Sequence, residues 1–153
     1  MFPQPPIAES PELGVRAWAF SAPTFFATQF VSPLKAGLEH AEFIVTAWEL
    51  ALGLEREQDS LFTAVHDWRK MLDYTSDFRR RLITWGRQES KKTESVVFVG
   101  PPDASPMIRM GASVSATALS LVGQHVEFRF EPDVTPILRS LGLAEPYLAP
   151  SEP

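Results

Sequence analysis

The sequence predicts an α/β domain whose sheet is mixed but mostly parallel. Three observations support this class: two aromatic-rich runs near the start, a continuous apolar run at 95–99, and helical patterns that alternate with the later apolar runs. Strands that alternate with helices form right-handed crossovers, which place the strands side by side in one direction. The expected order of elements is β-β-α-β-α-β-α-β-α.

The first expected elements are a hairpin and a helix. The runs 15–20 and 24–30 are separated only by Ser-Ala-Pro, which predicts two antiparallel strands. The pair 32–33, Ser-Pro, is typical of a helix cap with proline at the first helical position. Apolar residues recur every three or four positions over 38–52, which predicts a helix that ends at Gly53.

A strand, a second helix and a buried strand are expected next. Residues 61–66 form an apolar run that predicts a strand. Phe78, Leu82 and Trp85 share the spacing of one helix face. The run 95–99 lacks alternation, which is typical of a strand that is covered on both faces of a parallel sheet.

The last expected elements are a helix, an edge strand and a short helix. The pair 105–106, Ser-Pro, predicts a helix start, and Gly123 is placed to end that helix. Residues 125–130 alternate strictly between polar and apolar, which predicts a strand with one solvated face near an edge. Residues 133–141 are expected to form a terminal helix that Gly142 closes.

Composition excludes some functions. The chain has 153 residues, a net charge of −5 and no cysteine, which excludes disulfides and thiolate sites and argues against a general nucleic-acid binder. No secretory signal pattern and no apolar run long enough to span a membrane is present, so we expect a cytoplasmic protein. Residues 1–12 and 143–153 are rich in proline and are expected to be disordered tails of one domain, residues 13–142.

Most catalytic signatures are absent from the sequence. No two glycines lie close enough for a phosphate-binding loop, and no Gly-x-Ser-x-Gly occurs. The three histidines are scattered, so no metal site is expected. His66 and Asp67 are neighbours on a strand and therefore point to opposite faces. We expect no enzyme and no cofactor, and we expect Trp18, Trp48, Trp68 and Trp85 to lie in the core.

One segment carries a local signature. Residues 73–76 read Asp-Tyr-Thr-Ser and stand between a predicted strand and a predicted helix. The wider pattern comprises His66-Asp67-Trp68, Met71, Arg79 to Leu82 and Thr84-Trp85. Together they resemble the switch region of STAS domains, the fold of bacterial anti-sigma-factor antagonists, and the STAS-like proteins of the SpoIIAA-like group. The resemblance covers about residues 13–142. Those antagonists have a glycine after the phosphorylated hydroxyl, where this chain has Asp77.

The resemblance implies a bacterial regulatory module without catalysis. Ser76 and Thr75 are then the candidate phospho-acceptors of a switch. The residues expected to contact a partner are Asp73, Tyr74, Arg79, Arg80 and Arg81. A hydroxyl at a helix start also caps the helix, so capping alone is the second interpretation of the same residues.

Charge and apolar distribution suggest what kind of partner could bind. Residues 69–92 carry eight basic and three acidic side chains, a net charge of +5, which leaves −10 for the rest. This helix could attract an anionic partner or simply form a solvated face. Residues 107–122 are apolar around most of a helix, which fits core packing, a dimer partner or lipid.

Two functions from different classes remain open at this point. The first is a protein-interaction module that binds a kinase-like or signalling protein, or a second copy, through residues 73–81. The second is a domain of the same fold that binds lipid or a small apolar ligand. A ligand binder predicts an apolar pocket of several hundred Å³, whereas an interaction module predicts a filled core and an exposed patch near Ser76.

Overall fold

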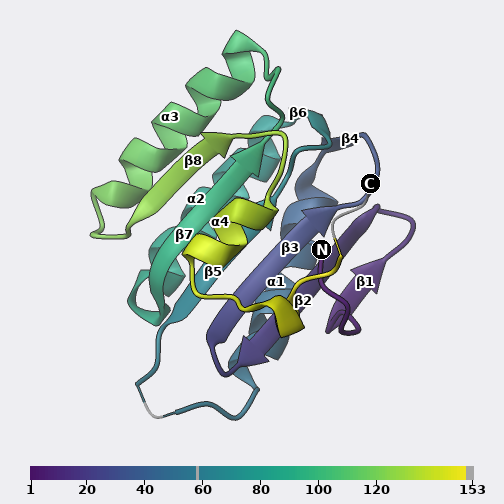
Figure 1. Cartoon of the computed structure of the whole chain (residues 1–153). Helices are drawn as coiled ribbons and strands as arrows, with labels where there is room; N and C mark the ends of the chain where they lie inside the picture. Colours follow the sequence, from purple (N-terminus) through teal and green to yellow (C-terminus); the bar gives the residue numbers. More distant parts are fainter. Residues whose placement is uncertain (58, 151–153) are drawn as a thin grey trace.

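The computed structural model describes residues 1–57 and 59–150, and its centre is a six-stranded sheet (Figure 1). The strands lie in the order β1–β2–β3–β5–β7–β8. Their bounds are β1 Ala8–Ser10, β2 Val15–Ser21, β3 Thr24–Phe30, β5 Phe62–Asp67, β7 Thr93–Gly100 and β8 Val126–Phe130. From β3 to β8 all neighbours are parallel, while β1, β2 and β3 pair antiparallel. The predicted class, α/β with a mixed and mostly parallel sheet, is therefore confirmed.

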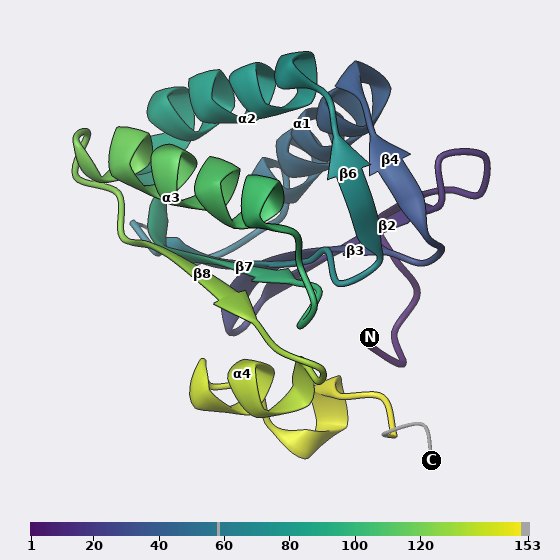
Figure 2. The same ribbon diagram turned by 90° about the horizontal axis from the view of Figure 1, so that it is seen from above.

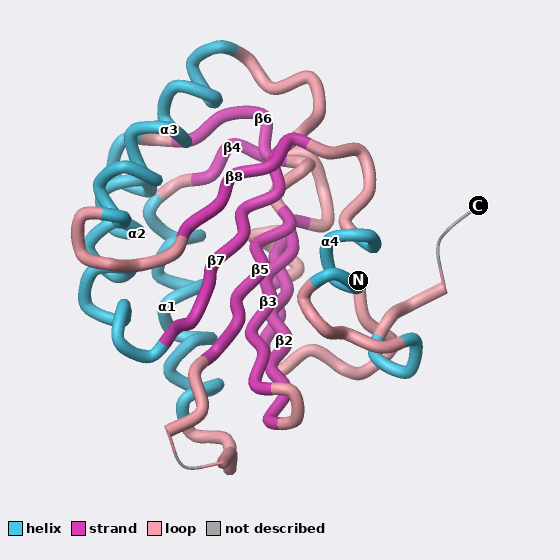
Figure 3. The backbone as a smooth tube through the Cα atoms, turned by 60° about the vertical axis from the view of Figure 1, so that its left-hand side comes forward, coloured by secondary structure: helices cyan, strands magenta, loops and turns pink. Residues whose placement is uncertain are grey.

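Helices α1, α2 and α3 form a layer on one face of the sheet, and α4 lies on the other face with segments near the chain ends (Figures 2 and 3). The layer consists of α1 Leu38–Leu52, α2 Ser76–Glu89 and α3 Pro106–Ser120. The opposite face carries α4 Thr135–Ser140 and a short 3₁₀ turn, Glu145–Tyr147. A further 3₁₀ turn, Ser90–Lys92, joins α2 to β7.

Several local predictions are confirmed. The two runs around Ser-Ala-Pro form the β2–β3 hairpin, and Gly53 is the C-cap of α1. The hydroxyl of Ser105 accepts a hydrogen bond from the Ile108 N–H at 3.3 Å and thereby caps α3. Strand β7 is buried on both faces, since Val96 and Phe98 belong to one core cluster and Val97 and Val99 to the other.

The helix start expected at Ser32-Pro33 is wrong. Residues Leu34–Ala36 form a strand, β4, which pairs in parallel with β6, Met71–Tyr74. This small second sheet was not expected, because its partners are far apart in sequence and neither strand has a strong local pattern. Helix α1 begins only at Leu38, after Gly37, whose N–H donates to His40 Nδ1 at 3.0 Å.

The two expected tails differ from the structure, because both carry packed side chains. Strand β1 lies in the first segment and pairs with β2. Phe2 and Leu148 are buried in the same cluster, on the α4 face of the sheet. These apolar side chains pack on the apolar α4 face of the sheet, and the prolines around them do not prevent this packing. Residues 151–153 of the second segment lie outside the described residues.

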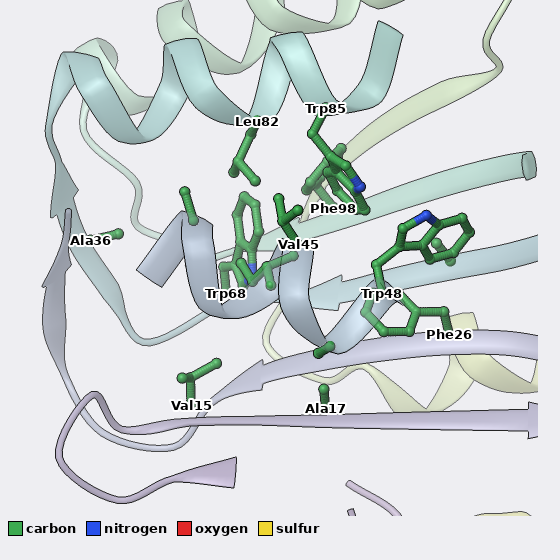
Figure 4. Packing of buried hydrophobic residues seen from close by; sticks show 14 of the residues in the cluster. Val15, Ala17, Phe26, Ala36, Val45, Trp48, Trp68, Leu82, Trp85 and Phe98 are labelled. Atoms are coloured by element: carbon green, nitrogen blue, oxygen red, sulfur yellow. The ribbon is translucent and has the colours of Figure 1, made fainter. Parts of the chain in front are cut away.

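The larger core cluster fills the space between the sheet and the helix layer (Figure 4). Trp48 of α1 contacts Phe26 and Phe62 with ring centroids 5.2 and 4.8 Å apart, and Trp85 of α2 lies 5.8 Å from it. All four tryptophans are buried, as the sequence predicted. The sheet thus presents α2 and α3 as neighbours above β7 and β8, which positions the site described next.

Candidate functional site

The candidate site lies where the starts of α2 and α3 meet. Strand β6 leads directly into Thr75, whose extended backbone and side chain cap α2, because its hydroxyl accepts a hydrogen bond from the Phe78 N–H at 3.2 Å. The capping role expected of a hydroxyl here is therefore confirmed for Thr75. Ser76 is the first residue of the helix and is exposed.

An open groove of about 270 Å³ crosses this point. Its lining residues are Tyr74, Ser76, Arg79, Met107, Met110, Gly111 and Val114. The apolar wall comes from α3, where Met107, Met110 and Val114 are 69%, 64% and 52% exposed. Met107, Met110 and Val114 are neighbours on the surface of α3, so they form one exposed apolar wall.

A smaller apolar cavity of about 70 Å³ lies below the groove, between α2, α3 and the sheet. It shares Tyr74, Arg79 and Gly111 with the groove, and its deeper walls come from β7 and β8. Its α3 wall includes the small residues Gly111, Ala112 and Ser115 beside Ile108 and Leu119. A cavity of this size is well below the 300–1,000 Å³ that holds a typical small ligand.

Tyr74 lines both the groove and the cavity. A methyl group added at Gly111 would overlap the Tyr74 hydroxyl, so the ring lies directly against the backbone of α3. A larger residue at this position would displace the Tyr74 ring, which occupies the volume of a side chain. The contact fixes the distance between the start of α2 and α3.

The arginines of the segment divide into engaged and free side chains. Arg80 forms an exposed ion pair with Asp77 at 3.4 Å, and Arg81 reaches Glu42 of α1 at 2.7 Å. Arg79 is half-buried in the wall of the groove, and no described residue forms an ion pair or side-chain hydrogen bond with it. Arg79 is thus the cation available to a molecule in the groove.

The remaining residues that the sequence singled out lie at the edge of this arrangement. Asp73 accepts a hydrogen bond from the Tyr74 N–H at 2.8 Å and lies 3.6 Å from the Lys35 ammonium of β4. Tyr74, Ser76 and Arg79 are brought together in the groove; Asp73, Arg80 and Arg81 do not line it. Met107, Met110, Gly111 and Val114 were not predicted as site residues, although the apolar circumference of residues 107–122 indicated that this helix has an uncovered side.

His66 lies in the core and not in the groove. Its Nδ1 shares a hydrogen bond of 2.7 Å with the Thr28 hydroxyl, which also accepts from Trp68 Nε1 at 3.2 Å. Its ring stacks on Phe98 at 4.7 Å, and its Nε2 is buried without a hydrogen-bond partner. Burial lowers the pKa of His66 to about 3, since the charged form would lose its hydration.

Asp67 points to the other face, as expected from its place next to His66. Both carboxylate oxygens bind the guanidinium of Arg69, at 2.7 and 2.9 Å, and Gln29 donates to the same carboxylate at 3.2 Å. Arg69 also donates to the carbonyl of Pro132. The hydrogen bond and charge of Asp67 raise the pKa of Arg69. This group ties β5 to the segment after β8.

His66, Asp67 and Ser76 are not brought together in the structure. His66 is enclosed by aromatic rings, Asp67 is held by Arg69, and Ser76 is exposed at the start of α2. Among residues 1–57 and 59–150, no three histidine or acidic side chains gather as a metal site would need. Within the same residues, none of the helices has the length and apolar character required to cross a bilayer.

Comparisons of this chain with protein-family models, with curated proteins and with solved structures find no match. The class that the geometry defines is therefore an α/β domain with a mixed, mostly parallel sheet and an apolar groove between two helices of one layer. Its function has to be argued from that groove.

Proposed function

We propose that this protein is a non-catalytic interaction module that binds a protein partner in the groove between α2 and α3. The observation that carries the proposal is the wall of three exposed apolar side chains beside an unpaired arginine. The resemblance of residues 73–76 to a STAS-like switch gives independent support from the sequence. A regulatory role in a signalling pathway follows from that resemblance.

The chemistry of the groove selects the kind of segment that would bind. Met107 and Met110 offer flexible, polarizable side chains that adapt to an apolar anchor. Arg79 and the free N–H groups at the start of α2 attract a carboxylate. The expected ligand is therefore a peptide segment of the partner that presents an apolar side chain close to an acidic one.

The hydroxyl of Ser76 would make this binding switchable. Ser76 lines the groove with Arg79, at the positive end of the α2 dipole. A phosphate on Ser76 would carry about −1.5 to −2 charges and would occupy Arg79 in place of the partner's carboxylate. Thr75 is the less suitable acceptor, because its hydroxyl already caps the helix.

Binding of lipid or a small apolar ligand is the second candidate, and the cavity beneath Tyr74 is the observation that favours it. Its volume of about 70 Å³ is well below that of a typical small-ligand site. A peptide segment can lie along the groove without entering the cavity. The interaction module is therefore preferred.

The test uses peptides selected on the full chain and binding measured by calorimetry. Selected peptides should share an apolar residue and a nearby carboxylate, and Met110→Asp and Arg79→Glu should each weaken binding at least tenfold. Leu50→Asp and Arg87→Glu are matched controls, exposed residues outside the groove, and should leave affinity unchanged. Ser76→Asp should weaken binding and Ser76→Ala should not.

Two results would contradict the proposal. Equal affinity of the selected peptides for the Met110→Asp variant would place binding elsewhere. A stoichiometric lipid or small molecule in native mass spectra of the purified chain would favour the ligand-binding alternative.

A further inference from the structure

The outer edge of β8 is a further surface on which no described residue pairs with the sheet. Strand β8 is the last strand of the sheet, and its five residues pair only with β7. The Val96 N–H donates to the His125 carbonyl at 2.9 Å, and Val96 stands level with Val126. In a parallel ladder this register turns the N–H and C=O groups of Val126, Phe128 and Phe130 away from β7.

These outward groups form a template for another strand. No described residue hydrogen-bonds to them, and the aromatic rings of Phe128 and Phe130 are only half-buried. The opposite edge of the sheet differs, because it ends in β1, a strand of three residues. An unpaired edge of a mostly parallel sheet is a site where a further strand is added, unless charge or shape opposes it.

The charges on β8 decide which strand fits. Glu127 and Arg129 lie on the same side of the strand, on the α4 face, where Glu127 is exposed and Arg129 half-buried, with their charged atoms 3.4 Å apart. If a second β8 pairs antiparallel about a two-fold axis at Phe128, Glu127 lies opposite Arg129 of the second copy, and Arg129 lies opposite its Glu127. Opposite charges across two strands stabilise the pair.

Other registers of the same pairing are disfavoured. Outward-facing residues can only pair with outward-facing residues, so the two-fold axis moves in steps of one residue along β8. An axis at Glu127 brings two glutamates together, and an axis at Arg129 brings two arginines together. The axis at Phe128 is also the one that uses all five residues, because Val126 then pairs with Phe130 of the second copy.

Helix α3 lies on the outer side of β8 at this edge of the sheet (Figure 1), so a two-fold axis at Phe128 also brings two α3 helices together. Arg109 of α3 stands over the Phe130 ring at 4.3 Å. At helical spacing from Arg109, α3 carries the small residues Ser113, Ala116 and Ser120, and the pairing requires the two helices to pack through them.

We infer that two copies of this chain form a homodimer by antiparallel pairing of β8 with β8 about a two-fold axis at Phe128. The pairing adds six main-chain hydrogen bonds, two cross-strand ion pairs and coverage of the exposed sides of the Phe128 and Phe130 rings. The interface joins two six-stranded sheets. It does not depend on the function proposed for the groove.

Sedimentation equilibrium of the full chain tests this inference. The wild type should show twice the 17.1 kDa mass of one chain. Glu127→Arg and Arg129→Glu alone should each weaken dimerisation at least tenfold, because each places like charges opposite one another. The double variant, which exchanges the two charges, should restore the dimer. As a control, exchange of the Glu9–Arg16 pair at the β1 edge should leave the mass unchanged.

A covalent version uses the absence of native cysteines. In the inferred register, residues 127 and 129 of two copies form a non-hydrogen-bonded pair with Cα atoms about 4.5 Å apart, within the range of a disulfide. Glu127→Cys combined with Arg129→Cys should therefore give a dimer on a non-reducing gel, and either change alone should not. A wild type that stays monomeric at 200 μM, or a dimer that neither single charge reversal weakens, would overturn the inference.

Discussion

The two halves of the helix layer are packed differently, although they cover the same sheet. Under α1 the space is filled by large rings, among them Trp48, Phe26 and Phe62, whose centroids lie about 5 Å apart. Between α2 and α3 the sheet is covered by a helix of small residues, and a cavity and a groove remain. Side-chain size therefore decides where this fold is closed and where it can bind.

The filled half should account for most of the stability. Trp48→Ala removes a ring that is 1% exposed and leaves a cavity, so we expect a loss of about 3–5 kcal/mol in the free energy of unfolding. Met110→Ala removes a similarly long side chain from the open half, where it is 64% exposed, and should change the free energy by less than about 0.5 kcal/mol. Urea denaturation measures both. Similar losses in the two variants would show that the halves do not differ.

The one tight contact in the open half should be sensitive to a single methyl group. Gly111→Ala forces the Tyr74 ring away from α3, so we expect a loss of about 1–3 kcal/mol. Tyr74→Leu in the same chain removes the overlapping atoms and should recover most of the loss, which a double-mutant cycle measures. Ser113→Ala on the exposed side of α3 serves as the control and should be nearly neutral. Additive losses would mean that Tyr74 does not cause the strain.

The pH dependence of stability should report on the burial of His66 in the filled half. The pKa of His66 is about 3 in the folded state and near 6.5 when unfolded, so below pH 6.5 the unfolded chain binds a proton that the folded chain excludes. The contribution of neutral His66 to the free energy of unfolding is therefore complete above about pH 6.5. Between pH 6 and pH 4, the titration of His66 should lower the free energy of unfolding by about 1.4 kcal/mol per pH unit.

The comparison is with His66→Phe, which keeps an aromatic ring beside Phe98 and removes the titration. Denaturation at pH 7, 6, 5 and 4 should show a shallower decline for this variant than for the wild type. The exposed His125 provides the control, because His125→Gln should keep the wild-type slope. Equal slopes for wild type and His66→Phe would mean that the ring is hydrated.

The candidate site could be predicted from the sequence only in part. The hydroxyl at the start of α2 was predicted because helix caps have local sequence patterns, and Thr75 confirms it. The residues of α3 that complete the site were not predicted, because Met110 and Gly111 meet Tyr74 only after the chain has passed through α2 and β7. A basic run also does not reveal which arginine stays free; that depends on Glu42 of α1, which engages Arg81.

The sequence by itself determined the elements that depend on neighbours along the chain: the hairpin of β2 and β3, the buried strand β7, the alternating strand β8, and the burial of every tryptophan. Periodicity and caps are local, so they are readable without a fold. Tertiary structure alone decided the pairing of β4 with β6, the docking of Phe2 and Leu148 on the second face, and the groove beside Arg79. Each of these is a contact between segments whose patterns are weak, and its free energy exists only once the sheet has brought them together.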